Sequence, residues 1–406
     1  MEVAPLELLA HLAAMGTPPD DGTAVLRVSA GLQRSLERVE RETLPFIAAG
    51  GGEIQFVFGP YGRGKTHFLK ALAQWASERG CVTAYVDCQR PFESLVETYR
   101  AIASGMVPPG RHNFFATTGI TRTIEACFTG LDATGQRMVI ERLKADQALS
   151  PDFRNLVVAY CTEGVAGSGD EDLVDELEAL LASTPTFRVT LGKLYRRHPS
   201  LPRPLGKLAR RNAAVWLRSL LSLPQVLGYN GLVVLFDETE ASLRSRRTPI
   251  LSRRQQAHLA HIRTFVDHMA IGAFRGCAIY YAVTEEFIEI AGRNLEALSQ
   301  RIERVRMPEL DGAPNQRAVW VNIDELTNPS PQDPLFYSDL GNRIIDIGRE
   351  AGLRSSDVRD ASELLADVGE EYANSITEGR VRDFVKEAAA LVAENVPPAV
   401  SQEKPK

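Results

Sequence analysis

The stretch Gly59-Pro60-Tyr61-Gly62-Arg63-Gly64-Lys65-Thr66 places the tightest constraint on how this chain can fold. It follows a short apolar run, residues 54–58, and precedes a segment with helical spacing, residues 67–79. Strand, glycine-rich turn and helix in this order form a phosphate-binding loop, because the glycines let several backbone N–H groups converge on one anion. The alternative is a glycine-rich turn that contains a lysine by chance.

The phosphate-binding interpretation predicts a site for ATP and Mg²⁺. We expect the loop residues 59–66, with His67 directly after them, to surround the phosphates at the positive end of the helix. Lys65 is expected to reach the β and γ phosphates. Thr66 is expected to bind Mg²⁺ through its hydroxyl.

A second motif supports this site. Residues 231–236 are apolar apart from the opening glycine and end in Asp237 and Glu238, the pattern of a buried parallel strand whose carboxyl end meets a ligand crevice. As a Walker B motif, Asp237 would bind Mg²⁺, directly or through water, and Glu238 would orient and deprotonate the attacking water. The alternative is a strand that ends in two solvated acids.

Three further positions are candidates for contacts with the γ phosphate. Thr284 follows the apolar run 277–283 and is a candidate sensor, a cap of the next helix, or both. Arg301 and Arg304 are candidates to reach the γ phosphate of a neighbouring subunit, or else solvated helix-end arginines. Arg382, ahead of Arg380, opens the last helix and is a candidate to contact the nucleotide.

Composition limits the class of protein. The 406 residues are 44% hydrophobic and carry a formal net charge of −6, so a large core is expected and any nucleic-acid surface must be local. The five cysteines are scattered without a CxxC pair, which favours reduced thiols in a cytoplasmic protein. No apolar run has membrane-spanning length, and the start lacks a basic region, so we expect neither a membrane segment nor a signal peptide.

The pattern in the remaining chain predicts two helical regions around the nucleotide-binding core. Residues 82–87 predict a second buried strand, residues 91–226 show helical patterns without a strand signal, and residues 305–310 are expected to close the sheet. From about residue 314 the pattern is again helical.

The assembled motifs resemble a known family. The phosphate-binding loop with His67-Phe68-Leu69, the segment Gly228-Tyr229-Asn230-Gly231-Leu232 that leads into Asp237-Glu238-Thr239-Glu240, and the run 380–385 are similar to BREX-type ATP-binding proteins (BrxD-like) of bacterial anti-phage systems. The resemblance spans about residues 25–391. It implies an AAA+-like ATPase that works beside a helicase or another DNA-handling partner.

We therefore expect an α/β fold, an AAA+-like P-loop NTPase with a parallel sheet, a large helical insertion and a C-terminal helical lid. The expected parts are an N-terminal helical segment (1–50), the ATPase core (51–104 and 227–312), the insertion (105–226), the lid (313–396) and a disordered tail (397–406).

Positive charge is segregated in this acidic chain. Residues 188–211 hold eight basic residues and no acid, and residues 244–254 hold five more and no acid. Such segments attract phosphate backbones without reading sequence, so DNA is a candidate partner. The alternatives are a solvated face and a docking surface for the acidic residues 170–178 of a neighbouring subunit in a homo-oligomer.

His258, His261 and His268 share a helix face, and we expect packed or surface histidines in preference to a zinc site.

Two functions remain open from the sequence. The first is an ATP hydrolase of an anti-phage system that couples turnover to DNA handling with its partner. The second is a nucleotide-gated assembly or signalling module with little intrinsic hydrolysis. The acid pair Asp237-Glu238 favours the first, and it also argues against a small-molecule kinase.

Overall fold

The computed structural model describes residues 3–88, 90–92, 94–110, 118–165, 170–185, 189–239, 251–294, 320–375, 377 and 379–397. The chain forms two compact units, each assembled from separate stretches of sequence. The helical unit contains Met1–Glu37, Gly59–Gln74 and Asn322–Lys406, and the sheet unit contains Arg38–Phe58 and Trp75–Val321.

A six-stranded sheet with the order β3-β2-β4-β5-β1-β6 is the centre of the sheet unit. The four inner strands β1 (Gly52–Phe58), β2 (Val82–Asp87), β4 (Leu232–Asp237) and β5 (Cys277–Val283) lie where the apolar runs of the sequence predict them. β1 pairs with β5, β5 with β4, and β4 with β2, all in parallel. A mixed α/β fold with a mostly parallel sheet is thus confirmed.

The two outer strands differ from expectation. β3 (Met106–Val107) pairs antiparallel with Thr83 and Ala84 of β2, although we expected no strand between residues 91 and 226. β6 (Trp320–Asn322) lies next to β1, and the expected last strand, residues 305–310, falls outside the described residues. Both observed strands are two or three residues long, so neither produces a periodic signal in the sequence.

Stacked aromatic rings run across the sheet and fix its register. Phe236 of β4 stacks on Tyr281 of β5 with centroids 4.5 Å apart, and Tyr281 stacks on Phe56 of β1 at 5.1 Å. The ring of Trp320 in β6 lies 4.8 Å from that of Phe58. Each such pair contributes about 0.5–1.5 kcal/mol beyond its buried area. The ladder holds the carboxyl ends of β4, β5 and β1 at one edge of the sheet.

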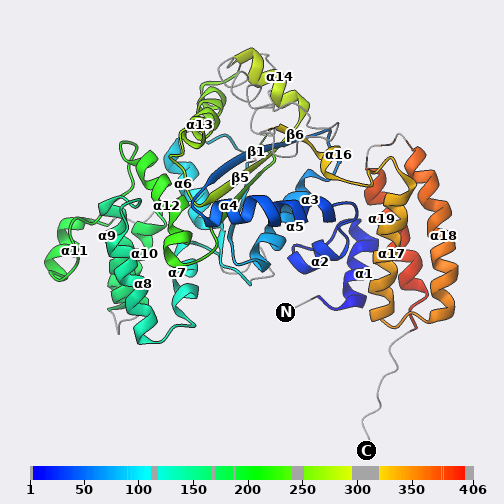
Figure 1. Ribbon diagram of the computed structural model, residues 1–406, viewed down its shortest axis with the longest axis horizontal. Helices are drawn as coiled ribbons and strands as arrows, with labels where there is room; N and C mark the ends of the chain where they lie inside the picture. The colour runs from blue at the N-terminus through cyan, green and yellow to red at the C-terminus, as the bar shows by residue number, and fades with distance from the viewer. Residues whose placement is uncertain are drawn as a thin grey trace, which may run out of the picture. The chain divides into compact units, whose positions relative to one another are not determined.

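Helices surround the sheet and form a separate lobe of the same unit (Figure 1). α6 contacts β2, α12 contacts β4, and α13 contacts β1. α7, α8 and α9 contact α12, and α10 contacts α7 and α9. Buried leucines and aromatics of these helices join the hydrophobic core of the sheet. The bounds are α6 (Leu95–Gly105), α7 (Ile120–Phe128), α8 (Ala133–Ala145), α9 (Pro151–Ala159), η2 (Tyr160–Val165), α10 (Glu171–Leu181), α11 (Leu191–Arg197), α12 (Ala213–Leu227), α13 (Arg253–Ala270) and α14 (Glu285–Asn294).

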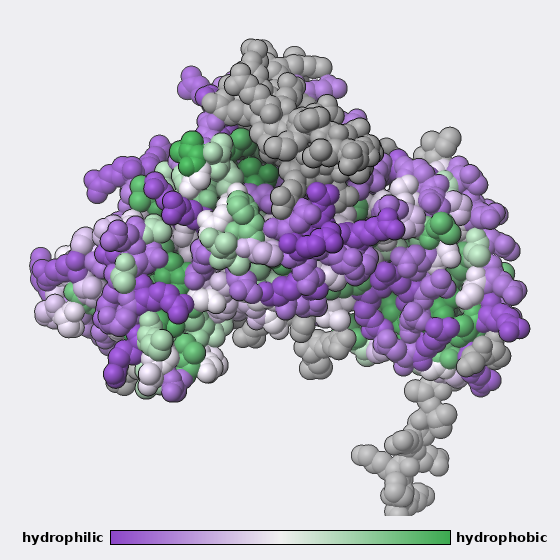
Figure 2. Space-filling view, viewed as in Figure 1, coloured by the Kyte–Doolittle hydropathy of each residue, from purple (hydrophilic) through white to green (hydrophobic). Residues whose placement is uncertain are grey.

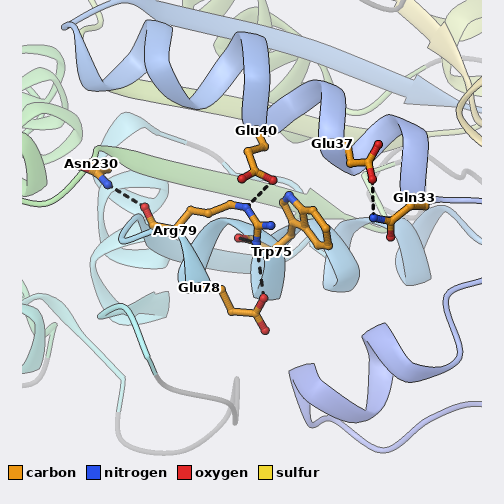
Figure 3. A network of polar contacts seen from close by, with 7 residues as sticks. All are labelled: Gln33, Glu37, Glu40, Trp75, Glu78, Arg79 and Asn230. Atoms are coloured by element: carbon orange, nitrogen blue, oxygen red, sulfur yellow. Dashed lines mark hydrogen bonds and ion pairs between the residues drawn. The ribbon is translucent and has the colours of Figure 1, made fainter.

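A polar network closes the end of α5 (Lys65–Glu78) in the sheet unit (Figure 3). The guanidinium of Arg79 stacks 3.6 Å from the Trp75 ring centroid, and its Nε lies 2.7 Å from Glu40. Asn230, two residues before β4, donates from Nδ2 to the Arg79 carbonyl at 2.7 Å. The network ties the C-terminus of the helix after the phosphate-binding loop to the chain that enters β4.

The helical unit has its own core, formed by both ends of the chain. α1 (Pro5–Met15) contacts α17 (Pro334–Glu350) and α19 (Arg380–Glu394), and α18 (Ser355–Asn374) contacts both α17 and α19 (Figure 1). Leu9, Leu12, Ile344, Phe384 and Val392 are buried in this core. Hydrophilic side chains cover most of the visible outer face of α17–α19 (Figure 2).

Shorter helices complete the chain. α2 (Gly22–Arg27) follows α1, and α16 (Ile323–Leu326) follows β6. The second half of the N-terminal helical segment consists of α3 (Gln33–Arg38), the π-helical turn η1 (Val39–Thr43) and α4 (Leu44–Ala48) in succession. Among the described residues, no helix is both long enough and apolar enough to cross a membrane.

Candidate nucleotide site

The phosphate-binding loop joins the end of β1 to the start of α5, as the motif predicts. Gly62 and Gly64 have φ values of 76° and 89°, in the left-handed region that residues with a Cβ rarely adopt. α5 begins at Lys65, so its free N–H groups and the positive end of its dipole belong to the loop. The local backbone therefore has two features that favour anion binding, a tight glycine turn and the free N–H groups at the start of a helix.

Lys65 is folded into its own loop. Its Nζ donates to the carbonyl oxygens of Gly59 at 2.8 Å and Pro60 at 2.9 Å, and the side chain is buried. Thr66 and Tyr61 are exposed, with Tyr61 63% accessible. The lysine is thus held at the loop, while the threonine hydroxyl and the tyrosine ring face outward.

His67 is a neutral anchor of the loop helix. Its Nε2 lies 2.8 Å from Oγ of Ser29, and this hydroxyl in turn donates to the carbonyl of Val25 at 2.8 Å. Because the serine proton is used on Val25, Nε2 carries the imidazole proton and donates to Ser29. Burial, with a contribution from Lys70, lowers the pKa of His67 to about 4. The histidine expected near the phosphates therefore connects α5 to the N-terminal segment.

The start of α19 approaches the same loop within the helical unit. A Cβ on Gly62 would lie 3.7 Å from the backbone nitrogen of Gly379. Arg63 donates to the side-chain oxygen of Gln332 at 2.5 and 3.0 Å when the amide is oriented to accept. The loop thus contacts both the segment after β6 and the start of the last helix.

The two arginines of α19 have different environments. Arg380 donates to the backbone carbonyls of Ala373 and Ser375 and so ties α19 to the end of α18. Arg382 is exposed, and its Cγ lies against Gly16 at the end of α1. Its expected contact with nucleotide stays a prediction.

Asp237 is a buried carboxylate, 4% exposed, at the last position of β4. Its Oδ1 accepts from the backbone N–H of Glu238 at 2.9 Å, and its Oδ2 accepts from the hydroxyl of Tyr85 in β2. Glu238 has a φ of 54°, which is unusual for a residue with a side chain and aims the half-buried glutamate out of the strand direction.

Tyr85 was not among the residues that the sequence singled out. Its position in β2 pairs with Leu235 of β4, so it shares a sheet face with Asp237 two residues further along. The sequence alone gives no register between two strands that are far apart in the chain, and the register is what brings this phenol to the carboxylate.

Thr284 follows β5 directly, between the ends of β1 and β4 in the sheet order. It is 7% exposed, and its hydroxyl has no hydrogen-bond partner in the described part of the chain. The hydroxyl therefore does not cap α14, which was the alternative. A buried polar atom without a protein partner is one that a ligand or an ordered water can satisfy.

The two residues predicted to bind metal carry the atom types that Mg²⁺ takes. Asp237 of the sheet unit has carboxylate oxygens and Thr66 of the helical unit a hydroxyl, and Mg²⁺ is usually held by one or two such groups together with water and substrate phosphates. Among the described residues, no group of three or more His, Cys, Asp or Glu side chains gathers as a metal site.

The three histidines of α13 are used for packing and backbone contacts. His258 accepts through Nδ1 from the N–H of Phe92 at 3.3 Å, and His261 Nδ1 lies 3.2 Å from the Phe92 carbonyl. Nδ1 of His268 lies 2.8 Å from the carbonyl of Thr264. Burial, with the neighbouring His261, lowers the pKa of His258 to about 4. These contacts agree with packed histidines.

The first basic segment is exposed where it is described. Its members Lys193, Arg196, Arg197, Arg203, Lys207, Arg210 and Arg211 are all exposed, and Figure 2 shows a largely hydrophilic surface at the α11 end of the lobe. Arg197 pairs with Glu176, and His198 lies 3.5 Å from Asp170. Two acids of residues 170–178 are therefore engaged within the chain.

Several predicted positions lie outside the described residues. They are Arg301 and Arg304, Arg188 of the first basic segment, and Arg244, Arg246 and Arg247 of the second. Arg253 and Arg254 open α13.

Comparison with protein families gives one match. The family described as BREX system ATP-binding protein BrxC/D matches residues 6–116 and 129–389. The match includes the phosphate-binding loop, the Asp237-Glu238 motif, Thr284, α17, α18 and the first ten residues of α19. No curated protein and no solved structure matches the chain significantly. Since the match covers nearly the whole chain, this protein belongs to the BrxC/D family of BREX system ATP-binding proteins.

Proposed function

We propose that this protein hydrolyses ATP with Mg²⁺ and that the turnover drives DNA handling by a BREX anti-phage complex. Family membership supports ATP binding, and the described site supports the chemistry that goes beyond binding. The observation that carries the proposal is the pair Asp237 and Glu238 at the end of a buried parallel strand. Directly after the neighbouring strand, the hydroxyl of Thr284 has no hydrogen-bond partner among the described residues.

Each residue has a distinct role in this proposal. The loop 59–66 binds and orients the phosphates, and Lys65 offsets their charge. His67 contributes its backbone at the start of α5, while its side chain anchors this helix to Ser29. Thr66 and Asp237 hold Mg²⁺, which would neutralise charge on the β and γ phosphates. Glu238 accepts a proton from the attacking water, and Thr284 orients that water or the γ phosphate.

The finer architecture is part of the proposal. We propose an AAA+-like ATPase core (51–104 and 227–312) with an N-terminal segment (1–50), a helical insertion (105–226), a lid (313–396) and a polar tail (397–406). Arg382 would contact nucleotide from the lid. Arg301 and Arg304 would act on the nucleotide of a neighbouring subunit in a homo-oligomer. The partner is a helicase or another product of the same defence operon.

DNA contact is proposed through the basic segments, which are separate in sequence from the two nucleotide-binding motifs. Seven exposed basic residues between residues 189 and 211 offer a sequence-independent surface for phosphate backbones. Arg203 covers the ring of Tyr195 at 4.5 Å, so this aromatic is already stacked inside the chain. We therefore propose backbone contact without base readout.

Steady-state ATP hydrolysis of the purified full chain tests the proposal. It is measured with and without single-stranded and double-stranded DNA, at two salt concentrations, beside Lys65→Ala and Glu238→Gln. We expect turnover that DNA stimulates, that salt suppresses, and that both substitutions abolish. ATP binding without turnover under every condition, including added operon partners, would exclude the hydrolase.

One observation favours a second function, a nucleotide-gated assembly module. The phosphate-binding loop belongs to the same compact unit as the C-terminal helices and contacts Gln332 and Gly379. Phosphates in the loop would therefore act directly on these helices, even with slow hydrolysis. A partner protein that binds the ATP-loaded Glu238→Gln variant as well as wild type, and does not bind the Lys65→Ala variant, would support this function.

A further inference from the structure

The contact between Tyr85 and Asp237 follows from the register of two neighbouring parallel strands. Tyr85 of β2 pairs with Leu235 of β4, and Asp87 pairs with Asp237. Side chains two residues apart on a strand share one face, so Tyr85 lies diagonally across from Asp237. A diagonal neighbour is within reach of a long aromatic side chain. The phenol hydroxyl accordingly donates to Oδ2 of Asp237.

This hydrogen bond complements the other contact of the carboxylate. Oδ1 accepts from the backbone N–H of Glu238 at 2.9 Å, so among the residues that the structure describes each oxygen of Asp237 accepts one hydrogen bond. Asp237 is 4% exposed, and a buried carboxylate with one donor on each oxygen has a fixed plane. Because each carboxylate oxygen has about two acceptor positions, Oδ2 can accept from Tyr85 and still face a metal-bound water.

We propose that Tyr85 is a positioning residue for the Mg²⁺ site: its hydroxyl holds the Asp237 carboxylate in the orientation that receives the metal of MgATP. The inference rests on the proposed Mg²⁺-dependent use of ATP. According to this inference, the metal affinity of the site depends partly on β2, a strand that contributes no residue to the phosphate-binding loop or to the Asp237-Glu238 motif. Partners of metal-binding carboxylates commonly change metal affinity 10- to 100-fold when they are removed.

The test measures Mg²⁺-dependent binding of a fluorescent ATP analogue to the full chain. Mg²⁺ is titrated at fixed analogue with wild type, Tyr85→Phe and the matched control Tyr229→Phe. Tyr229 also loses a hydroxyl hydrogen bond, to the carbonyl of Thr123 at 3.0 Å, but it does not contact Asp237. We expect Tyr85→Phe to raise the half-saturating Mg²⁺ concentration about tenfold, with affinity in EDTA unchanged. Tyr229→Phe is expected to match wild type in both measurements.

A double-mutant cycle separates positioning from a general loss of structure. Tyr85→Phe is repeated in the Asp237→Asn background, where the carboxylate that it orients is gone. We expect no additional loss there, because residues that act through one another are not additive. An equal loss in both backgrounds, or a half-saturating concentration within twofold of wild type, overturns the role of Tyr85. A wild-type protein whose analogue binding ignores Mg²⁺ overturns the proposed metal site as well, and is recognised from the wild-type titration alone.

Discussion

Nε2 of His67 donates to the hydroxyl of Ser29 across 2.8 Å, and this bond joins the first turn of the loop helix to the N-terminal segment of the same unit. The bond needs a serine that donates onward to Val25, which fixes the imidazole tautomer. Thr66, the proposed Mg²⁺ ligand, and His67, which anchors the helical unit, are therefore adjacent in the chain.

His67 makes stability depend on pH. Its pKa falls from an ordinary 6.5 to about 4 on folding, so protons bind more readily to the unfolded chain. The contribution is complete above pH 6.5 and is lost as the pH falls toward 4, with an upper size of roughly 3 kcal/mol. We expect the free energy of unfolding, measured in urea, to fall less between pH 7 and pH 4 for His67→Asn than for wild type. His258 titrates with the same sign in both proteins, so the difference between the two curves isolates His67. Parallel curves would contradict the prediction.

Glu238 combines its proposed role as the base with backbone strain. Its φ of 54° costs a residue with a Cβ about 1–2 kcal/mol, which glycine does not incur. Glycine also gives the unfolded chain more freedom, so the net gain expected for Glu238→Gly is up to about 1 kcal/mol in the free energy of unfolding. Hydrolysis is expected to fall at least about 100-fold, because the proposed base is lost.

Glu238→Gln is the control for this exchange. It keeps the Cβ and the strain, so we expect the same loss of hydrolysis without a gain in stability. Denaturant midpoints and ATP turnover of the three proteins check both parts. A glycine variant less stable than the glutamine variant would show that the left-handed backbone is not under strain.

Substitution of two glycines that have nearly equal φ distinguishes the cost of backbone strain from the cost of steric overlap. Gly16 and Gly272 have φ values of 67° and 64°. A Cβ on Gly272 would meet nothing within 4 Å, whereas one on Gly16 would lie 2.5 Å from the backbone oxygen of Arg382. We expect Gly272→Ala to cost about 1 kcal/mol and Gly16→Ala about 2–4 kcal/mol in chemical unfolding. Equal losses would mean that α1 and α19 do not meet at this point.

The exposed arginines at the start of α12 test the nucleic-acid proposal. Arg210 and Arg211 are exposed, and neither has an ion-pair partner among the described residues. If both contact phosphates, Arg210→Ala with Arg211→Ala should weaken DNA binding uniformly across sequences. It should also lower the slope of log affinity against log salt by about 2. Fluorescence anisotropy at several salt concentrations measures both. The control is Arg349→Ala, which removes an arginine of the helical unit that pairs with Asp346. It should leave the salt dependence of DNA binding unchanged.

The sequence predicted most of what depends on local patterns. The four inner strands were found because each is a buried apolar run, and the loop 59–66 because its glycines and Lys65 have a fixed spacing. The short strands β3 and β6 were missed, since Met106 and Trp320 belong to a sheet only through their neighbours. Tyr85 was missed for the same reason, because its role arises from the register of β2 on β4. The environment of Arg382 at Gly16 likewise depends on the packing of helices from opposite ends of the chain.

The helical unit needs both ends of the chain, and this has a consequence for synthesis. Leu8 and Leu9 of its core are made first, the loop helix follows, and Phe384 and Val392 come last. Contacts this distant in sequence form slowly and cannot form on the ribosome before the last helix emerges. The sheet unit, which ends at Val321, can collapse earlier. During synthesis the sheet can therefore form while the phosphate-binding loop still lacks the later helices of its own unit that pack beside it.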